Sequence, residues 1–208
     1  PAPLPSMAGR FVGREAELVA VTDACQAARL VSLVGPAGIG KTRLAVEAAA
    51  TLGAARPHGP WFADLTLVRE PEDVAWAAAR AVGLREFGRE PALDRLALYL
   101  RDRDGLLVLD GCVAAAETLG LILRLTSECP NLSILATARE PMATDGERCV
   151  PVGGFAVPDA QGAGEQVWRD SPAVELFERR AYEANREFRL TDAMLGAVAD
   201  LCVVVGGS

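Results

Sequence analysis

The sequence has very little lysine and very little histidine. Of its 21 basic residues, Lys41 is the single lysine, and the single histidine is His58, which stands in a Pro/Gly turn. One histidine removes most histidine-based metal sites, and the Ser/His and Cys/His nucleophilic mechanisms, from consideration. We therefore expect His58 to be an exposed loop residue. Lys41 becomes the first place to look for chemistry that demands a lysine.

Paired cysteines and long apolar runs are missing too. The five cysteines form no C-x-x-C pair, which indicates neither a disulfide framework nor a zinc site and favours a reducing cytoplasm. The longest stretch without Asp, Glu, Lys or Arg runs from Leu30 to Gly40, well short of the roughly 18 apolar residues of a membrane-spanning helix. Residues 1–6 have neither the basic start nor the apolar stretch of a signal peptide. We expect a cytoplasmic protein that makes no membrane contact.

The chain has fewer basic than acidic residues: 21 Lys and Arg against 28 Asp and Glu give a net charge of −7. This balance argues against the chain gripping a nucleic-acid backbone, so DNA contact is expected only through domains absent from this chain. Half of the residues are hydrophobic, which is typical of a globular protein. The 208 residues suffice for one large α/β domain, or for a core domain with the start of a second.

Short apolar runs alternate with longer helical patterns, and this alternation is typical of βαβ units with a mainly parallel sheet. The helices are expected at residues 14–28, 41–52, 71–82, 91–101 and 114–128. The strands are expected at Leu30–Val34, Trp61–Leu65, Leu106–Asp110, Leu132–Thr137 and Cys149–Val152.

The pattern changes after the last expected strand. Residues 158–170 are rich in Gly, Ala and polar residues, which predicts a linker after a core of residues 1–157. Ser171 and Pro172 then match the N-cap and first position of a helix, and Thr191 caps another helix that runs toward Val204. Residues 171–208 are therefore expected to be a truncated helical segment, and the chain to be part of something longer.

One glycine-rich segment matches the phosphate-binding P-loop. Gly35-Pro-Ala-Gly-Ile-Gly-Lys41-Thr42 fits G-x-x-x-x-G-K-[ST] and stands between an expected strand and an expected helix. In such a loop the glycines let backbone N–H groups point at phosphate oxygens, and the helix N-terminus adds partial positive charge. Lys41 would meet the β- and γ-phosphates, and the Thr42 hydroxyl would ligate Mg²⁺. The nucleotide contacts predicted here are Gly35, Ala37, Gly38, Ile39, Gly40, Lys41, Thr42 and Arg43.

Three further residues are expected at the same edge of the sheet. Asp110 ends a strand on the carboxyl side, where ligands of open α/β sheets gather, and beside a P-loop it is the Walker-B candidate for Mg²⁺. By itself an Asp at a strand end would be a turn residue. The next strand delivers Thr137 and Arg139 there. Arg139 could contact the γ-phosphate and distinguish ATP from ADP, or it could pair with Glu140 at the surface.

Five motifs in this order resemble the nucleotide-binding domain of STAND ATPases, an AAA-like group that includes NB-ARC domains. The resemblance is closest to the domains inside large bacterial transcriptional regulators of the SARP and LuxR types, and it covers about residues 4–205. The motifs are Phe11-Val-Gly-Arg-Glu15, the P-loop, Leu107-Val-Leu-Asp-Gly-Cys112, Ile134-Leu-Ala-Thr-Ala-Arg-Glu-Pro141 and Gly146-Glu-Arg-Cys-Val150.

This resemblance implies a five-stranded P-loop core followed by a small helical lid. It implies that ATP or ADP binds as a switch, and that ATP-dependent assembly controls an effector domain elsewhere in the polypeptide. The segment Val12, Gly13 and Arg14 would lie beside the adenine and ribose, Arg139 would sense the γ-phosphate, and Pro172 is assigned to the nucleotide contacts as well.

The chain departs from the family in two places. The Leu-Pro-Leu lid motif is missing, and Gly111 to Ala114 supply no carboxylate after Asp110. We predict a switch and oligomerisation module with slow or weak Mg²⁺-dependent ATP hydrolysis. A self-standing ATP-hydrolysing enzyme or small-molecule kinase is the alternative, in which Glu140 or Glu117 would have to reach the phosphates. A scaffold with a dead nucleotide site is disfavoured because the P-loop and Asp110 are intact.

Overall fold

The computed structural model describes residues 4–7, 9–85, 90–156 and 165–205. Its contacts divide the chain into two compact units. The first consists of Ala16–Val152 with the start of the chain, and the second combines Gly9–Glu15 with the residues from Gly153 onward. Each unit has a core of its own.

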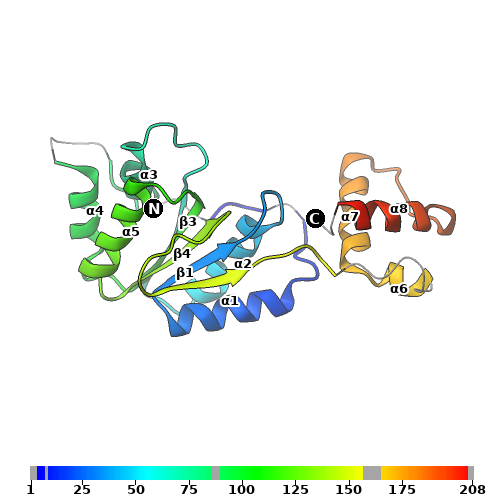
Figure 1. Ribbon diagram of the computed structural model, residues 1–208, viewed down its shortest axis with the longest axis horizontal. Coiled ribbons are helices and arrows are strands. Elements are labelled where there is room, and N and C mark those ends of the chain that lie inside the picture. The colour runs from blue at the N-terminus through cyan, green and yellow to red at the C-terminus, as the bar shows by residue number, and fades with distance from the viewer. Residues whose placement is uncertain (1–3, 8, 86–89, 157–164, 206–208) are drawn as a thin grey trace. The chain divides into compact units, whose positions relative to one another are not determined.

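The first unit is built on a five-stranded sheet in the order β2-β3-β4-β1-β5, and every neighbouring pair is parallel (Figure 1). The predicted α/β fold with a parallel five-stranded sheet is therefore confirmed. β1 has the predicted bounds, and β2 begins earlier than predicted. The strands are β1 (Leu30–Val34), β2 (His58–Asp64), β3 (Gly105–Cys112), β4 (Leu132–Ala138) and β5 (Glu147–Pro151).

His58 is exposed, as expected, but it opens a strand and does not lie in a loop. Its N–H donates a hydrogen bond of 3.1 Å to the Asp104 carbonyl, and it stands opposite Gly105 in the ladder between β2 and β3. This backbone pairing extends β2 beyond the apolar run that the sequence pattern marked.

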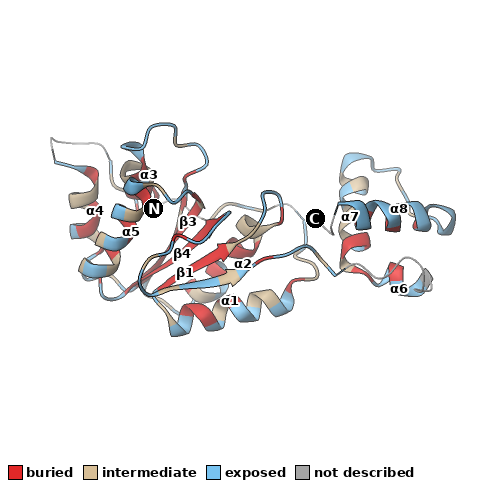
Figure 2. Ribbon diagram, in the orientation of Figure 1, coloured by how far each residue is buried: buried red, intermediate tan, exposed pale blue. Residues whose placement is uncertain are grey.

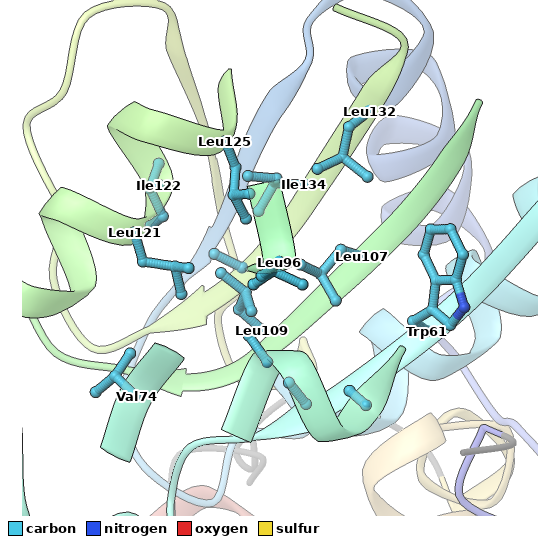
Figure 3. Packing of buried hydrophobic residues seen from close by; sticks show 14 of the residues in the cluster. Trp61, Val74, Leu96, Leu107, Leu109, Leu121, Ile122, Leu125, Leu132 and Ile134 are labelled. Atoms are coloured by element: carbon cyan, nitrogen blue, oxygen red, sulfur yellow. The ribbon is translucent and has the colours of Figure 1, made fainter. Parts of the chain in front are cut away.

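Helices cover both faces of this sheet. Three of them, α3, α4 and α5, pack against one another over one face. There, Leu107 and Leu109 of β3 share a core with Leu96, Leu121 and other apolar side chains (Figure 3). Because side chains alternate along a strand, the equally buried Leu106 belongs to the opposite face, along which α2 packs. The helices are α1 (Glu15–Ala27), α2 (Lys41–Gly53), α3 (Asp73–Ala81), α4 (Ala92–Leu100) and α5 (Ala116–Glu128).

The second unit contains α6 (Glu165–Arg169), α7 (Pro172–Ala184) and α8 (Asp192–Val204). Trp168, Val174 and Leu195 belong to its small core. α6 lies within the stretch predicted to be a linker, of which residues 158–164 are outside the described residues. The predicted boundaries between core, linker and lid stay a prediction.

Both predicted caps of the second unit lie at helix starts, but neither works through its side chain. Ser171 and Thr191 precede α7 and α8 with extended backbones, yet neither hydroxyl donates or accepts a capping hydrogen bond. The Ser171 hydroxyl is buried and has no hydrogen-bond partner among the residues that the structure describes. The helix starts were predicted correctly, and the capping bonds were not.

Among the described residues, no helix combines the length and the apolar character needed to cross a bilayer. All five cysteines are free thiols, and Cys149 is the exposed one.

Candidate functional site

The predicted P-loop joins the carboxyl end of β1 to the first residue of α2. Glycine is required at Gly35, because a Cβ there would lie 2.2 Å from the Val152 carbonyl oxygen. Gly38 and Gly40 have φ angles of +80° and +95°, in the left-handed region that favours glycine. A Cβ on Gly38 would meet nothing within 4 Å, so open space lies beside this part of the loop.

Lys41 folds back over this loop. Its ammonium group donates hydrogen bonds to the carbonyl oxygens of Gly35, at 2.9 Å, and Pro36, at 2.7 Å. Partial burial lowers the pKa of Lys41; the nearby Arg139 lowers it further, whereas Asp110 opposes the shift. The lysine is thus a cation held at the loop by backbone oxygens.

Asp110 lies next to Thr42, as the Mg²⁺ prediction requires. The Thr42 hydroxyl oxygen is 2.8 Å from Oδ1 and 3.0 Å from Oδ2 of Asp110. Asp110 is 5% exposed, so its carboxylate is nearly buried and needs such partners. A carboxylate and a hydroxyl are hard oxygen ligands of the kind that Mg²⁺ prefers.

A single cavity of about 760 Å³ brings these groups together, a size typical of ligand pockets. Lys41, Thr42, Asp110 and Arg139 all line it, as sequence analysis predicts for the phosphate and metal end of a nucleotide site. Glu140 lines it as well, and Glu117 does not. The complete lining is Ala37, Gly38, Lys41, Thr42, Thr66, Asp110, Gly111, Cys112, Val113, Ala114, Thr137, Ala138, Arg139 and Glu140.

The remaining predicted P-loop residues do not line this cavity. Ile39 is buried, and the Arg43 guanidinium forms a 2.8 Å ion pair with Glu47, one turn along α2. Gly35 and Gly40 act through the backbone conformation of the loop.

Arg139 forms no ion pair with Glu140 in the part of the chain that the structure describes, so the surface pairing considered above does not occur there. Both side chains are exposed and both line the cavity. This leaves the Arg139 guanidinium available to an anion in the cavity.

The residues expected beside the adenine and ribose belong to the second unit. Arg14 is buried; it donates a 2.8 Å hydrogen bond to the Gly153 carbonyl and lies 4.5 Å from the centre of the Phe155 ring. A Cβ on Gly13 would lie only 2.3 Å from the Pro172 Cβ, so these two residues are in close contact. The structure thus brings the Val12–Arg14 segment together with Pro172, and their nucleotide contacts stay a prediction.

Two threonines of this site were not among the predicted nucleotide or metal contacts, although Thr137 was expected at this edge of the sheet. Thr66 follows β2, and its backbone N–H donates to the Asp64 carboxylate at 2.9 Å. Thr137 lies at the end of β4, and its hydroxyl donates to Oδ1 of Asp110 at 2.7 Å. Thr137 and Ser133 are the polar residues of this buried strand, and the need of a buried hydroxyl for a partner was the signal that could have given Thr137 a role.

No family model matches the sequence. A protein of Mycobacterium bovis, named as a candidate HTH-type transcriptional regulator, is 35% identical over 175 residues, which are 84% of this chain and 18% of that protein. The regulatory protein AfsR of Streptomyces coelicolor is 34% identical over 140 residues, covering 59% of this chain and 14% of AfsR. The chain thus spans less than a fifth of these curated relatives.

Among solved structures, similarity extends over nearly the whole chain. A signal transduction ATPase with numerous domains (STAND) from Pyrococcus horikoshii, with a tetratricopeptide repeat sensor, matches with a TM-score of 0.57. The match covers 98% of this chain and 29% of that protein at 18% identity, which supports the fold alone.

Proposed function

We propose that this chain, which belongs to the P-loop NTPase domains of STAND-type bacterial transcriptional regulators, acts as an ATP- and ADP-binding switch and oligomerisation module of a longer regulator. The observation that carries the proposal is the cavity lined by Lys41, Thr42, Asp110 and Arg139. Two cations, one hydroxyl and one carboxylate around a space of this size suit a nucleoside polyphosphate with its metal ion.

The groups present fit that ligand. Backbone N–H groups of the P-loop and the Lys41 ammonium would bind the phosphates, and Thr42 with Asp110 would hold Mg²⁺. When bound, Mg²⁺ neutralises charge on the β- and γ-phosphate oxygens. Lys41 can exchange its two carbonyl partners for phosphate oxygens, which as anions are stronger acceptors.

Arg139 supports switching rather than mere binding. A switch needs a group that interacts differently with ATP and ADP, because a ligand shifts an equilibrium only through differential affinity. An exposed guanidinium on the cavity wall is suited to the extra charge of the γ-phosphate. We therefore assign Arg139 as the sensor of that phosphate.

The same cavity suggests slow turnover. Asp110 is already bound to Thr42, and the next positions are Gly111, Cys112 and Val113, which carry no carboxylate. Burial, followed by the charges of Asp110 and Glu147, raises the pKa of the Cys112 thiol to about 12, so this group is neutral at pH 7. Missing general-base assistance costs about 10²- to 10⁴-fold in rate, and we expect at most a slow Mg²⁺-dependent ATPase.

One observation favours the second candidate, a self-standing ATP-hydrolysing enzyme or small-molecule kinase. Glu140 lies on the cavity wall and could orient an attacking water or hydroxyl. Phosphate release separates the two candidates: many turnovers per second, reduced by Glu140→Gln, would support the enzyme. Turnover below about one per minute would support the switch, since general-base assistance is then lacking.

We further propose that the partners are a second copy of this domain and other domains of the full-length protein. The net charge of −7 makes DNA contact through this chain unfavourable. The free thiols suit a cytoplasmic location. Kinship with AfsR favours the SARP type of regulator, whereas the LuxR type and the NB-ARC relationship stay predictions.

Calorimetry with ATP and ADP in the presence of Mg²⁺ tests the central claim. Lys41→Ala removes a charge-assisted contact worth about 1.5 to 3 kcal/mol, so affinity for both nucleotides should fall at least tenfold. Arg139→Ala should weaken ATP binding and spare ADP. Equal affinities of wild type and Lys41→Ala would overturn the binding site, and light scattering with ATP against ADP tests the assembly.

A further inference from the structure

The ladder between β3 and β4 is interrupted beside the Mg²⁺ ligand Asp110. Leu109 pairs with Ala136, but the next pair is Cys112 with Ala138. From one pair to the next, β3 therefore advances by three residues and β4 by two, so β3 has one extra residue here. Gly111 lies in this bulge with a φ of +79°. A bulge leaves backbone groups without their ladder partners, and it redirects neighbouring side chains.

Thr137 is the β4 residue at this interruption, and its side chain takes the place of the missing ladder bond. The Gly111 N–H donates to the Thr137 hydroxyl oxygen at 2.9 Å. Since an N–H can only donate, the Thr137 proton remains for Asp110, whose Oδ1 lies 2.7 Å away. The direction of both hydrogen bonds is therefore fixed by chemistry.

The hydrogen bond from Thr137 makes the two oxygens of the Asp110 carboxylate different from each other. Oδ1 of Asp110 accepts from Thr137 and also lies 2.8 Å from the Thr42 hydroxyl, whereas Oδ2, 3.0 Å from that hydroxyl, has no other side-chain hydrogen-bond partner among the described residues. Thr137 is 1% exposed, so water does not compete for its hydroxyl. A carboxylate clamped at one oxygen keeps a single orientation when Thr42 exchanges its hydrogen bond for a cation.

We infer that Thr137 is a positioning residue that fixes the Asp110 carboxylate for a divalent cation beside Thr42. The inference rests on the proposed function, because it requires the metal–nucleotide site described above. It adds a role for Thr137, a residue of the cavity wall that acts through Asp110. Such a residue should affect the dependence of nucleotide binding on Mg²⁺ while leaving metal-free binding unchanged.

The test is calorimetric titration of ATP in Mg²⁺ and in EDTA, with wild type, Thr137→Val and Thr137→Ser. Thr137→Val keeps the shape but loses the hydroxyl, and we expect its affinity for ATP with Mg²⁺ to fall about tenfold, with affinity in EDTA unchanged within about twofold. Thr137→Ser keeps the hydroxyl and should restore the Mg²⁺ dependence of the wild type. Equal losses in Mg²⁺ and in EDTA, or no loss in either, would overturn the inference.

A double-mutant cycle sharpens the result. In an Asp110→Asn background, Thr137→Val should produce no further loss of Mg²⁺ dependence, because its only route to the metal has been removed. If Thr137→Val does not fold, Thr137→Ala takes its place, and unfolding of both would assign the hydroxyl to the stability of the sheet edge and overturn the inference. If the wild type binds ATP equally well in Mg²⁺ and in EDTA, the metal site of the proposed function itself is refuted. If the wild type needs Mg²⁺ and Thr137→Val needs it equally, only the role of Thr137 is refuted.

Discussion

The two units of the chain differ in the size of their hydrophobic cores. In the first, β4 is buried along its whole length and β3 along nearly all of it (Figure 2). Its buried Asp110 accepts hydrogen bonds from two threonines. In the second, the smaller core comes from α6, α7 and α8, and α8 leaves Leu201 and Val204 exposed at 44% and 82%. Regions with few buried apolar contacts are the ones that open most readily. The phosphate end of the candidate site thus lies in the unit with the larger buried core.

This comparison predicts that the two units respond separately to loss of core packing. Leu107→Ala removes a fully buried side chain of β3 and should cost about 2 to 5 kcal/mol of unfolding free energy, while Leu195→Ala in α8 should fall at the lower end, since a small core collapses more easily. Hydrogen exchange by mass spectrometry resolves the effect by segment. Leu107→Ala should deprotect β1, β3 and β4 and spare α7 and α8, and Leu195→Ala should do the reverse.

The exposed Leu98 supplies the control for that experiment. It is 66% exposed on α4, so Leu98→Ala should change stability by no more than about 0.5 kcal/mol. Simultaneous loss of protection in both units after either core substitution would show one cooperative body and break the comparison.

The N-terminal segment should depend on glycine at its contact with α7. Gly13 has a φ of +67°, and the close approach of Pro172 leaves no room for a methyl group. We expect Gly13→Ala to destabilise the second unit by about 1 to 3 kcal/mol through strain and overlap. Gly196 in α8 is the matched control: a Cβ there meets nothing within 4 Å, and Gly196→Ala should stabilise the helix by about 0.5 to 1 kcal/mol. Urea denaturation of both variants checks the signs, and a Gly13→Ala as stable as wild type would contradict the packing.

The first unit was largely predictable because its signals are local. β1 runs over Leu30–Val34 as expected, since a continuous apolar run between turn residues marks a buried strand wherever it occurs. The P-loop was found by spacing alone, and the topological rule that ligands gather at the carboxyl edge placed Asp110 and Arg139 on one cavity.

What could not be predicted depends on residues far apart in the sequence. The bulge that joins Gly111 to Thr137 arises from the register of two strands, which no local pattern encodes. The contact of Gly13 with Pro172 likewise links opposite ends of the chain. The sequence around Gly13 alone indicates a turn. The reason for glycine at this position, its close packing against Pro172 of α7, is visible only in the folded structure.

Ser171 offers the smallest predicted effect and the clearest conflict between a local rule and the structure. As an N-cap, serine is worth about 0.5 to 2 kcal/mol over alanine, so the sequence rule predicts that Ser171→Ala destabilises α7. Within the described part of the chain its hydroxyl caps no helix and is buried without a hydrogen-bond partner, which costs about 1 to 3 kcal/mol of desolvation. The backbone bond of 3.0 Å from the Glu175 N–H to the Ser171 carbonyl does not need the hydroxyl and survives the substitution.

We therefore expect Ser171→Ala to leave stability unchanged or to raise it by up to about 1 kcal/mol, since the variant no longer buries an unpaired hydroxyl. The midpoint of urea denaturation and the exchange rates of α7 amides report this change. Thr191→Ala is the control, because Thr191 also precedes a helix without capping it but is exposed, and its effect should stay within about 0.5 kcal/mol. A loss of 1 kcal/mol or more for Ser171→Ala alone would mean that the hydroxyl does cap α7 in solution. Such a loss would leave the contrast between the units unchanged, because that contrast rests on apolar burial.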